Sequence, residues 1–150
     1  MLEHIGEVMD SSSIMAHKES NTLIIRKNTN YTKPVNLKAN LMAGMNSRFM
    51  ESITVDGDLV LGKGAQIMGD AKAKNVVLGP WAVIRGNLTV SGELLALDNS
   101  KVLGNVKCYG SVITRPGVVF RSLDATGLVE YYGKKPAGKI RSKMITKKDD

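Results

Sequence analysis

The sequence predicts an all-β protein: a single-domain parallel β-helix, a rod in which each turn of the chain, here called a coil, stacks on the coil before it. One observation is an internal repeat of 17 to 18 residues, because self-similarity at a fixed period is the signature of a repeat architecture. The other is that apolar residues recur in pairs spaced by two, which puts both side chains on one face of a strand. Three pairs per copy predict three short strands in a triangular coil.

The copies of the repeat follow one another along most of the chain. Residues 53–70, 71–87, 88–105 and 106–122 align almost without gaps. Residues 35–52 match the first of these in their apolar positions, residues 17–34 form a weaker copy, and a further copy begins at Leu123 and then degenerates. We therefore expect about six coils, which at the usual strand spacing of about 4.8 Å make a rod on the order of 30 Å long.

The aligned copies define columns of residues that are expected to point into the core. In the copy at residues 106–122, the alignment places Ile113 and Val119 in inward columns. Because like residues stack on like residues and no coil can bury its core alone, the stability of the rod should be close to a sum of neighbour terms. The column that opens each copy reads Val35, Ile53, Ala71, Leu88, Val106 and Leu123.

Turn-forming residues recur at three places in each copy, where the corners of the coil are expected. Glycine and asparagine tolerate the positive φ that sharp corners need. Trp81 lies at one of these corners, so we expect it to point outward. The corner residues include Gly57, Asn75, Gly92, Gly110 and Gly127 at the first corner, Gly64 and Asn99 at the second, and Gly69, Gly86 and Gly104 at the third. The period itself fits either hand of helix.

We expect one domain, the β-helix at residues 21–133. A tail at residues 1–20 precedes it, and a basic, flexible tail at residues 134–150 follows it. The last segment holds seven of the 21 Lys and Arg residues against two Asp, in a chain of net charge +7. Three interpretations of this segment stay open: a solvated, disordered end, contact with an anionic membrane surface, and nucleic-acid binding, which the lack of interleaved aromatic residues disfavours. The anionic partner would contact Lys134, Lys135, Lys139, Arg141 and Lys143.

The two ends of a β-helix expose unpaired backbone groups and a slice of apolar core. Natural proteins cap such edges or use them to pair with another chain. No capping helix is evident in the sequence, so we expect the protein to polymerise with itself by coil stacking. The expected contact residues are Leu23 and Ile25 at one end and Phe120 and Tyr131 at the other. Ordinary packing in the core or against a cap is the alternative interpretation of each of them.

The sequence offers little for catalysis. His4 and His17 both lie outside the repeat columns, so a zinc site or a histidine base is not expected in the coils. Carboxylates recur beside glycines, as turn residues do, and no phosphate loop or dinucleotide fingerprint is present. Cys108 fits a small buried hydrophobe. We expect no enzymatic activity, no cofactor and no small-molecule substrate, and hence assembly without nucleotide.

The segments VVLGPWAVIRGNLTVSGELLAL (76–97) and VLGNVKCYGSVITRPGVVF (102–120) resemble the bactofilins, which are polymer-forming bacterial cytoskeletal proteins. The resemblance covers roughly residues 35–130. It implies a right-handed β-helix with disordered tails that assembles without nucleotide into non-polar filaments, often at the membrane, where they scaffold envelope enzymes. Because no secretory signal and no stretch of ~20 apolar residues is visible, we expect a cytoplasmic protein, peripheral at the inner face of the cell membrane.

A second resemblance stays open beside the first. Leu61-Gly-Lys-Gly-Ala-Gln and Leu78-Gly-Pro-Trp-Ala-Val each fit the hexapeptide pattern of left-handed β-helix acyltransferases and of their carbonic-anhydrase-like relatives. Those proteins use histidines from the coils for catalysis or metal binding, and the repeat columns of this chain contain none. The alternative is therefore a left-handed trimer, acyltransferase-like or ligand-binding but catalytically inert.

Overall fold

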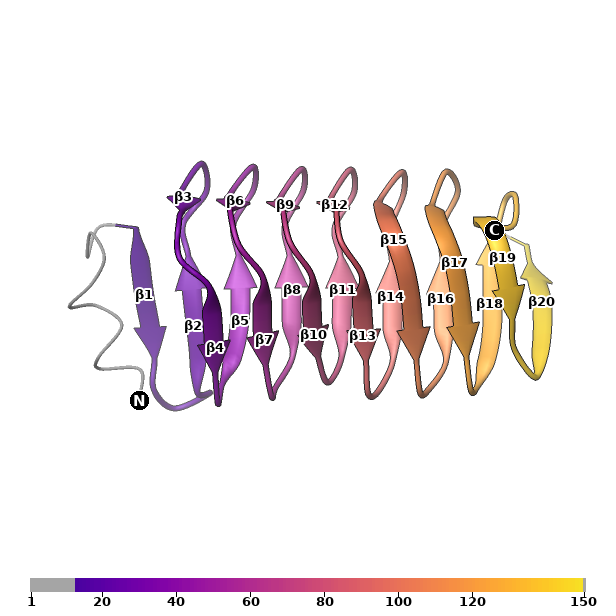
Figure 1. Ribbon diagram of the computed structural model, residues 1–150, viewed down its shortest axis with the longest axis horizontal. Helices are drawn as coiled ribbons and strands as arrows, with labels where there is room; N and C mark the ends of the chain where they lie inside the picture. Colours follow the sequence, from indigo (N-terminus) through magenta and orange to yellow (C-terminus); the bar gives the residue numbers. More distant parts are fainter. Residues whose placement is uncertain (1–12, 150) are drawn as a thin grey trace.

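The computed structural model describes residues 13–149 and confirms a parallel β-helix, with about seven turns (Figure 1). Residues 13–149 contain strands and turns and no helix. In Figure 1 the nearer strands run downward and the fainter, more distant strands run upward while the chain advances from left to right, so the coil is right-handed. This hand agrees with the one expected from the bactofilin resemblance and rules out a left-handed hexapeptide β-helix.

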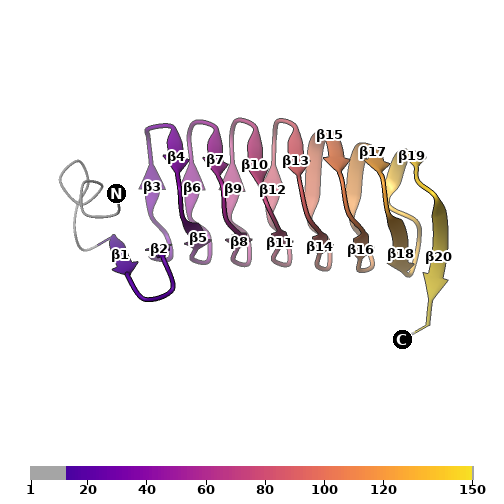
Figure 2. The same ribbon diagram turned by 90° about the horizontal axis from the view of Figure 1, so that it is seen from below.

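One side of the rod, here called face A, is an uninterrupted sheet. Its eight parallel strands come from successive coils, and an antiparallel strand, β1 (Ile14–His17), pairs with the first of them. Figure 2 shows this face along one long side of the rod and the other strands along the opposite side. The parallel strands are β2 (Thr22–Ile25), β5 (Asn40–Ala43), β8 (Leu59–Leu61), β11 (Val76–Leu78), β14 (Leu94–Ala96), β16 (Val112–Thr114), β18 (Leu128–Tyr132) and β20 (Met144–Lys148).

The other two sides, faces B and C, complete the triangle. From the fifth coil on, single strands run through both faces: β15 (Lys101–Cys108), β17 (Val119–Ala125) and β19 (Ala137–Arg141). In earlier coils each face has a strand of its own. Face B has β3 (Asn30–Tyr31), β6 (Arg48–Phe49), β9 (Gln66–Ile67) and β12 (Val83–Ile84), and face C has β4 (Val35–Leu37), β7 (Ile53–Val55), β10 (Ala71–Ala73) and β13 (Leu88–Val90).

The core is a stack of aligned inward side chains. Alternation along each three-residue strand buries the first and third residues, as Leu59 and Leu61 are buried on either side of Val60, because successive side chains of a strand point to opposite faces. The pairing register then places equivalent residues directly above one another. One such column on face A consists of Leu41, Leu59, Val76, Leu94, Val112 and Val129, each at most 2% exposed.

The corner between faces A and B turns through a residue with positive φ. Trp81 occupies this position in one coil, with φ of 64° and 55% of its surface exposed, so it points outward as predicted. A positive φ is a rare conformation for a bulky side chain and costs on the order of 1 kcal/mol. The residues with positive φ at this corner are Asn28, Asn46, Gly64, Trp81, Asn99, Gly117 and Gly133.

Polar side chains connect successive coils at the corner between faces B and C. The Asp70 carboxylate accepts a hydrogen bond from the backbone N–H of Asn87 at 2.8 Å, and the Asn87 side chain accepts one from the N–H of Asn105 at 2.9 Å. The ladder begins with the hydroxyl of Ser52, which accepts from the N–H of Asp70 at 3.0 Å. Each bond satisfies a backbone donor that the sharp turn leaves unpaired, which is the structural role expected for carboxylates beside glycines.

The β-helix extends past both predicted boundaries. At the C-terminal side it continues beyond residue 133, because β19 and β20 form a further coil on β17 and β18 with Leu123 paired to Ile140 and Val129 to Ile145. The segment predicted to be a flexible basic tail is therefore mostly strand. At the N-terminal side, β1 belongs to the segment predicted to be a tail. Residues 1–12, including His4, lie outside the described part of the chain.

Two residues were assigned to the wrong column in the sixth coil. Thr114, not Ile113, stacks on Ala96, and Phe120, not Val119, stacks on Val102. Both errors have the same cause: an apolar residue stands on the outside next to the inward residue, so hydrophobicity alone selects the wrong one. Thr114 and Phe120 are 0% and 1% exposed.

The buried hydroxyl of Thr114 has no hydrogen-bond partner. An unsatisfied buried polar group is destabilising, and replacing it with an isosteric apolar group removes that cost. We expect Thr114→Val to increase the free energy of unfolding by about 1–2 kcal/mol, measured by chemical denaturation. A Thr126→Val variant at an exposed corner is the control and should leave stability nearly unchanged; a loss of stability in Thr114→Val would show that the hydroxyl is satisfied.

Adjacent residues of β13 provide a test of the inward and outward assignment. Val90 is fully buried, whereas its neighbour Thr89 faces outward. We expect Val90→Asp to lower the free energy of unfolding by about 4 kcal/mol, because it buries an unpaired charge, and Thr89→Asp to change it little. Thermal unfolding followed by circular dichroism measures both, and equal effects of the two substitutions would contradict the assignment.

Candidate interaction sites at the two ends

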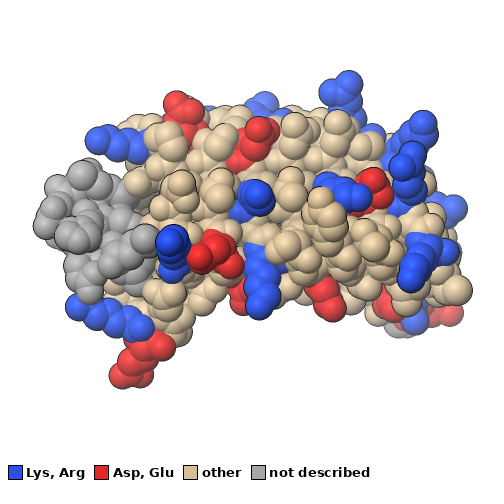
Figure 3. Space-filling model, turned by 60° about the horizontal axis from the view of Figure 1, so that its bottom comes forward, with Lys and Arg blue, Asp and Glu red and all other residues tan. Residues whose placement is uncertain are grey.

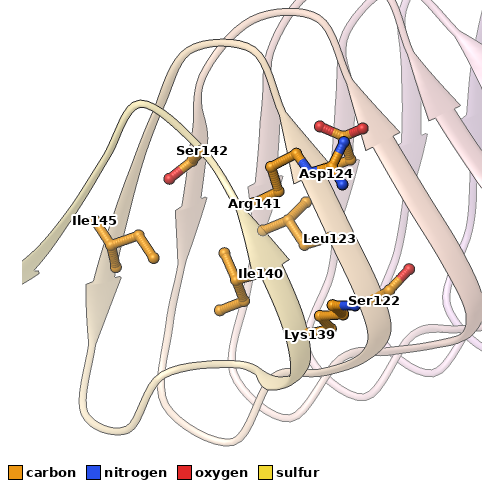
Figure 4. A pocket seen from close by; sticks show the side chains of 8 residues that line it. All are labelled: Ser122, Leu123, Asp124, Lys139, Ile140, Arg141, Ser142 and Ile145. Carbon is orange, nitrogen blue, oxygen red and sulfur yellow. The ribbon is translucent and has the colours of Figure 1, made fainter.

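The C-terminal end of the rod presents two unpaired strand edges. Within residues 13–149 no strand pairs with the outer edge of β19 or β20. Between them lies a hollow into which the partly buried side chains of Ile140 and Ile145 project, next to Leu123 of the preceding coil (Figure 4). Asp124, Lys139, Arg141 and Ser142 complete its lining. The end therefore combines apolar core surface with free backbone hydrogen-bonding groups, which is what another strand requires for pairing.

The backbone of Ile145 faces away from the rod. Residues of the same column in earlier coils, such as Leu59 and Leu94, donate their backbone N–H groups to the coil that follows, at 2.8 Å and 3.0 Å. In a parallel pair these directions alternate along the strand, so the N–H of Ile145 points to the side where the described chain supplies no further coil. Ile145 therefore presents both an apolar side chain and a backbone donor at this end.

The N-terminal end has an apolar hollow of its own. Leu23 and Ile25 of β2 line it together with Tyr31, Pro34 and Val35. The Tyr31 ring packs against Phe49 with 5.9 Å between ring centroids, and burial raises the pKa of the Tyr31 hydroxyl. Strands β3 and β4 are the terminal strands of their sheet in the described chain, whereas the outer edge of β2 is occupied by β1.

Of the four predicted contact residues, two lie at an end of the rod and two do not. Leu23 and Ile25 lie at the N-terminal end as expected, although both are buried. Phe120 and Tyr131 do not lie at the C-terminal end, because β19 covers the strand of Phe120 and Lys147 of β20 pairs with Tyr131. Ile140 and Ile145 take the terminal positions instead. A signal for them was present in the sequence, since Ile140 follows Leu123 by one 17-residue period.

The predicted basic residues belong to this last coil. Lys134 and Lys135 precede β19, Lys139 and Arg141 lie on it, and Lys143 lies in the turn before β20. Lys and Arg side chains gather toward the C-terminal end of the rod in Figure 3. Lys148 lies 4.0 Å from the carboxylate of Glu130. Residues 134–150 hold seven Lys and Arg against two Asp, so positive charge exceeds negative charge in this segment.

Groups suited to catalysis or metal binding are sparse in the described chain. Residues 13–149 contain no cluster of three or more His, Cys, Asp or Glu side chains placed to hold a metal ion. His17 lies on β1 and its Nδ1 is 2.7 Å from the hydroxyl of Ser20. The Cys108 thiol is buried and 3.2 Å from the carbonyl oxygen of Gly92, and burial raises its pKa. No helix capable of spanning a bilayer is found between residues 13 and 149.

Comparison with known proteins does not assign this chain to a family. No protein-family model, no curated protein and no solved structure matches this chain. The function of this chain is therefore inferred from the geometry of the rod and its two ends.

Removing the last coil tests whether residues 134–150 are part of the fold. A chain that ends at Gly133 would lose β19 and β20 and would expose Phe120 and Leu123. We expect its melting temperature to fall by roughly 5 °C or more, because apolar area returns to water. An unchanged melting temperature would mean that this segment is a tail.

Proposed function

We propose that this chain is a structural protein that assembles end to end into filaments without nucleotide. The single observation that supports this most strongly is the C-terminal end, where the unpaired edges of β19 and β20 surround the apolar hollow of Ile140 and Ile145. Docking a second end coil at strand spacing would satisfy the free backbone groups and continue the core columns. Each added molecule would gain the same neighbour terms that hold the coils together.

The geometry of the rod fits a filament subunit. Its two ends lie at opposite extremes of the long axis (Figure 1), so contacts at both ends would extend the assembly in one direction. At the N-terminal end the contact would involve β3 and β4 on faces B and C. On face A it would meet β1, so a continuous sheet there would require pairing with β1 or its displacement.

A membrane-associated scaffold role forms the finer part of the proposal. The Lys and Arg side chains around β19 and β20 would attract an anionic lipid surface, at about 1 kcal/mol for each residue near it. The same charges repel one another when two C-terminal ends approach, so moderate salt should favour end contacts and weaken lipid binding. The resemblance to bactofilins supports cytoskeletal and envelope-scaffolding roles in the cytoplasm, and such filaments would recruit envelope-associated proteins.

A proline at residue 145 tests the end contact. Proline has no N–H, and the N–H of Ile145 points away from β18, so Ile145→Pro removes a donor from the free edge without breaking a bond within the rod. We expect wild-type protein at micromolar concentration to form filaments in negative-stain electron micrographs and Ile145→Pro to form short rods. Ile145→Val keeps the donor and the apolar character and should still form filaments.

Two results would contradict the proposed end-to-end assembly. Filaments of Ile145→Pro as long and as numerous as those of the wild type would exclude this edge as the contact. Monodisperse particles of the wild type across salt concentrations would exclude polymerisation. Thermal unfolding of each variant shows whether the rod itself remains intact.

A further inference from the structure

The outer side of face A carries a continuous row of apolar side chains, here called the apolar ladder. Each strand of this face points one middle residue outward, and in six successive coils that residue is apolar. The outward positions of face C are polar instead, among them Asn36, Thr54, Lys72 and Thr89. The apolar ladder consists of Ile24, Met42, Val60, Val77, Leu95 and Ile113.

Solvent reaches the apolar ladder. Met42 is 45% exposed, and the other members are partly exposed. A groove on this face is lined by Val77, Leu95 and Ile113, and the carboxylates of Glu93 and Glu130 also line it. Single exposed apolar residues are ordinary, but a contiguous apolar surface over six coils, about 29 Å at strand spacing, is typical of an interaction site.

Charges alternate in sign along the corner that borders the apolar ladder. Four successive coils carry Lys38, Asp58, Lys74 and Glu93 in the segments that join face C to face A, here called the charged row. The two lysines directly follow strands of face C, and the two carboxylates directly precede strands of face A. Asp56 adds a second carboxylate to the coil of Asp58. Reversing the order of such a row exchanges its signs, so the row is complementary to its own antiparallel copy.

We propose that face A binds a second copy of this chain, face to face and antiparallel, about a two-fold axis between Val60 and Val77. This axis lies at the centre of the apolar ladder and of the charged row. It places Val60 against Val77, Met42 against Leu95 and Ile24 against Ile113 of the other copy. The same operation places Lys38 opposite Glu93 and Asp58 opposite Lys74, as an isologous two-fold interface requires.

The opposite border of face A is compatible with this arrangement. The axis brings Met45 near Leu97 and Lys63 near Trp81, whose indole is exposed, and a lysine over an indole face is favourable. Arg115 would approach the basic residues of the first coil, but it already pairs with Asp98 at 3.5 Å. At this border Asp98 offsets part of the repulsion between Arg115 and those basic residues.

A second copy matches the surface in spacing and in area. The ladder repeats at the strand spacing of about 4.8 Å, and another face A offers the same repeat. Six coils at about 4.8 Å, each with about six residues at about 3.4 Å, present roughly 600 Å² per copy. The dimer then lies at the lower limit of stable interfaces, about 1,200 Å² in total. We therefore expect a dimer that forms at micromolar concentration.

An anionic bilayer suits this face less well. The charged row has both signs, whereas a lipid surface attracts rows of lysine and arginine. The positive charge of the rod gathers instead toward its C-terminal end (Figure 3).

Sedimentation equilibrium of the full chain tests the pairing, with Ile145→Pro as background to suppress end contacts. We expect a two-chain mass at about 100 μM, consistent with the interface area, and a shift to monomer in Leu95→Glu. Thr89→Glu, an outward substitution in the same coil on face C, is the matched control and should keep the dimer. Charge reversal adds a test without an apolar change: Glu93→Lys should weaken the dimer at least tenfold, and Glu93→Lys combined with Lys38→Glu should restore it.

The outcomes also separate this proposal from the end-to-end one. A monomer at about 100 μM in the Ile145→Pro background, or a dimer unaffected by Leu95→Glu, would overturn the face A pairing, whereas filament formation is tested separately by comparing wild type with the Ile145 variants. Failure of the double charge reversal to restore the dimer would overturn the antiparallel register. Loss of binding to phosphatidylserine vesicles in Leu95→Glu, with a monomeric Ile145→Pro background, would assign the face to a bilayer instead.

Discussion

Each inward side chain of this rod packs between the equivalent side chains of the coil before and the coil after. Leu59, for example, stacks between Leu41 and Val76 and has no exposed surface. Its backbone N–H donates to the carbonyl oxygen of Asn75 in the next coil, so packing and pairing depend on one spacing, about 4.8 Å. The corners must keep that spacing too, and a Cβ added to Gly104 would clash with the carbonyl oxygen of Gly86 in the preceding coil.

The dependence on neighbours has a direct consequence for the end coils. A central coil is satisfied on both sides, whereas the coil of β19 and β20 has neighbours on one side only within the described chain. Its core residues Ile140 and Ile145 are correspondingly only partly buried. At the other end, β1 occupies the edge of one face out of three. The features that make the coils stack within one molecule thus also make the ends suitable for contact with another.

Much of the fold could be predicted from the sequence, because inward columns repeat side chains of similar size and the corners repeat Gly and Asn. The failures have physical reasons. Thr114 is a polar residue in an apolar column, and the outward Ile113 conceals it. The last coil was missed because Lys and Arg surround its few inward residues, and Phe120 was consequently placed at an end. Strand β1 follows no repeat, since it pairs antiparallel. The residues of the apolar ladder lie at outward positions, and only the pairing register shows that they share one face.

X-ray diffraction from oriented assemblies tests most directly that the coils stack along the axis of a filament. The account predicts a meridional reflection near 4.8 Å, because strands separated by that distance would follow one another along the fibre axis. It also predicts an axial repeat of about 34 Å, or twice that if the ends alternate, since seven coils at this spacing form each subunit. A reflection near 4.8 Å on the equator would contradict the account, because the rods would then lie across the filament.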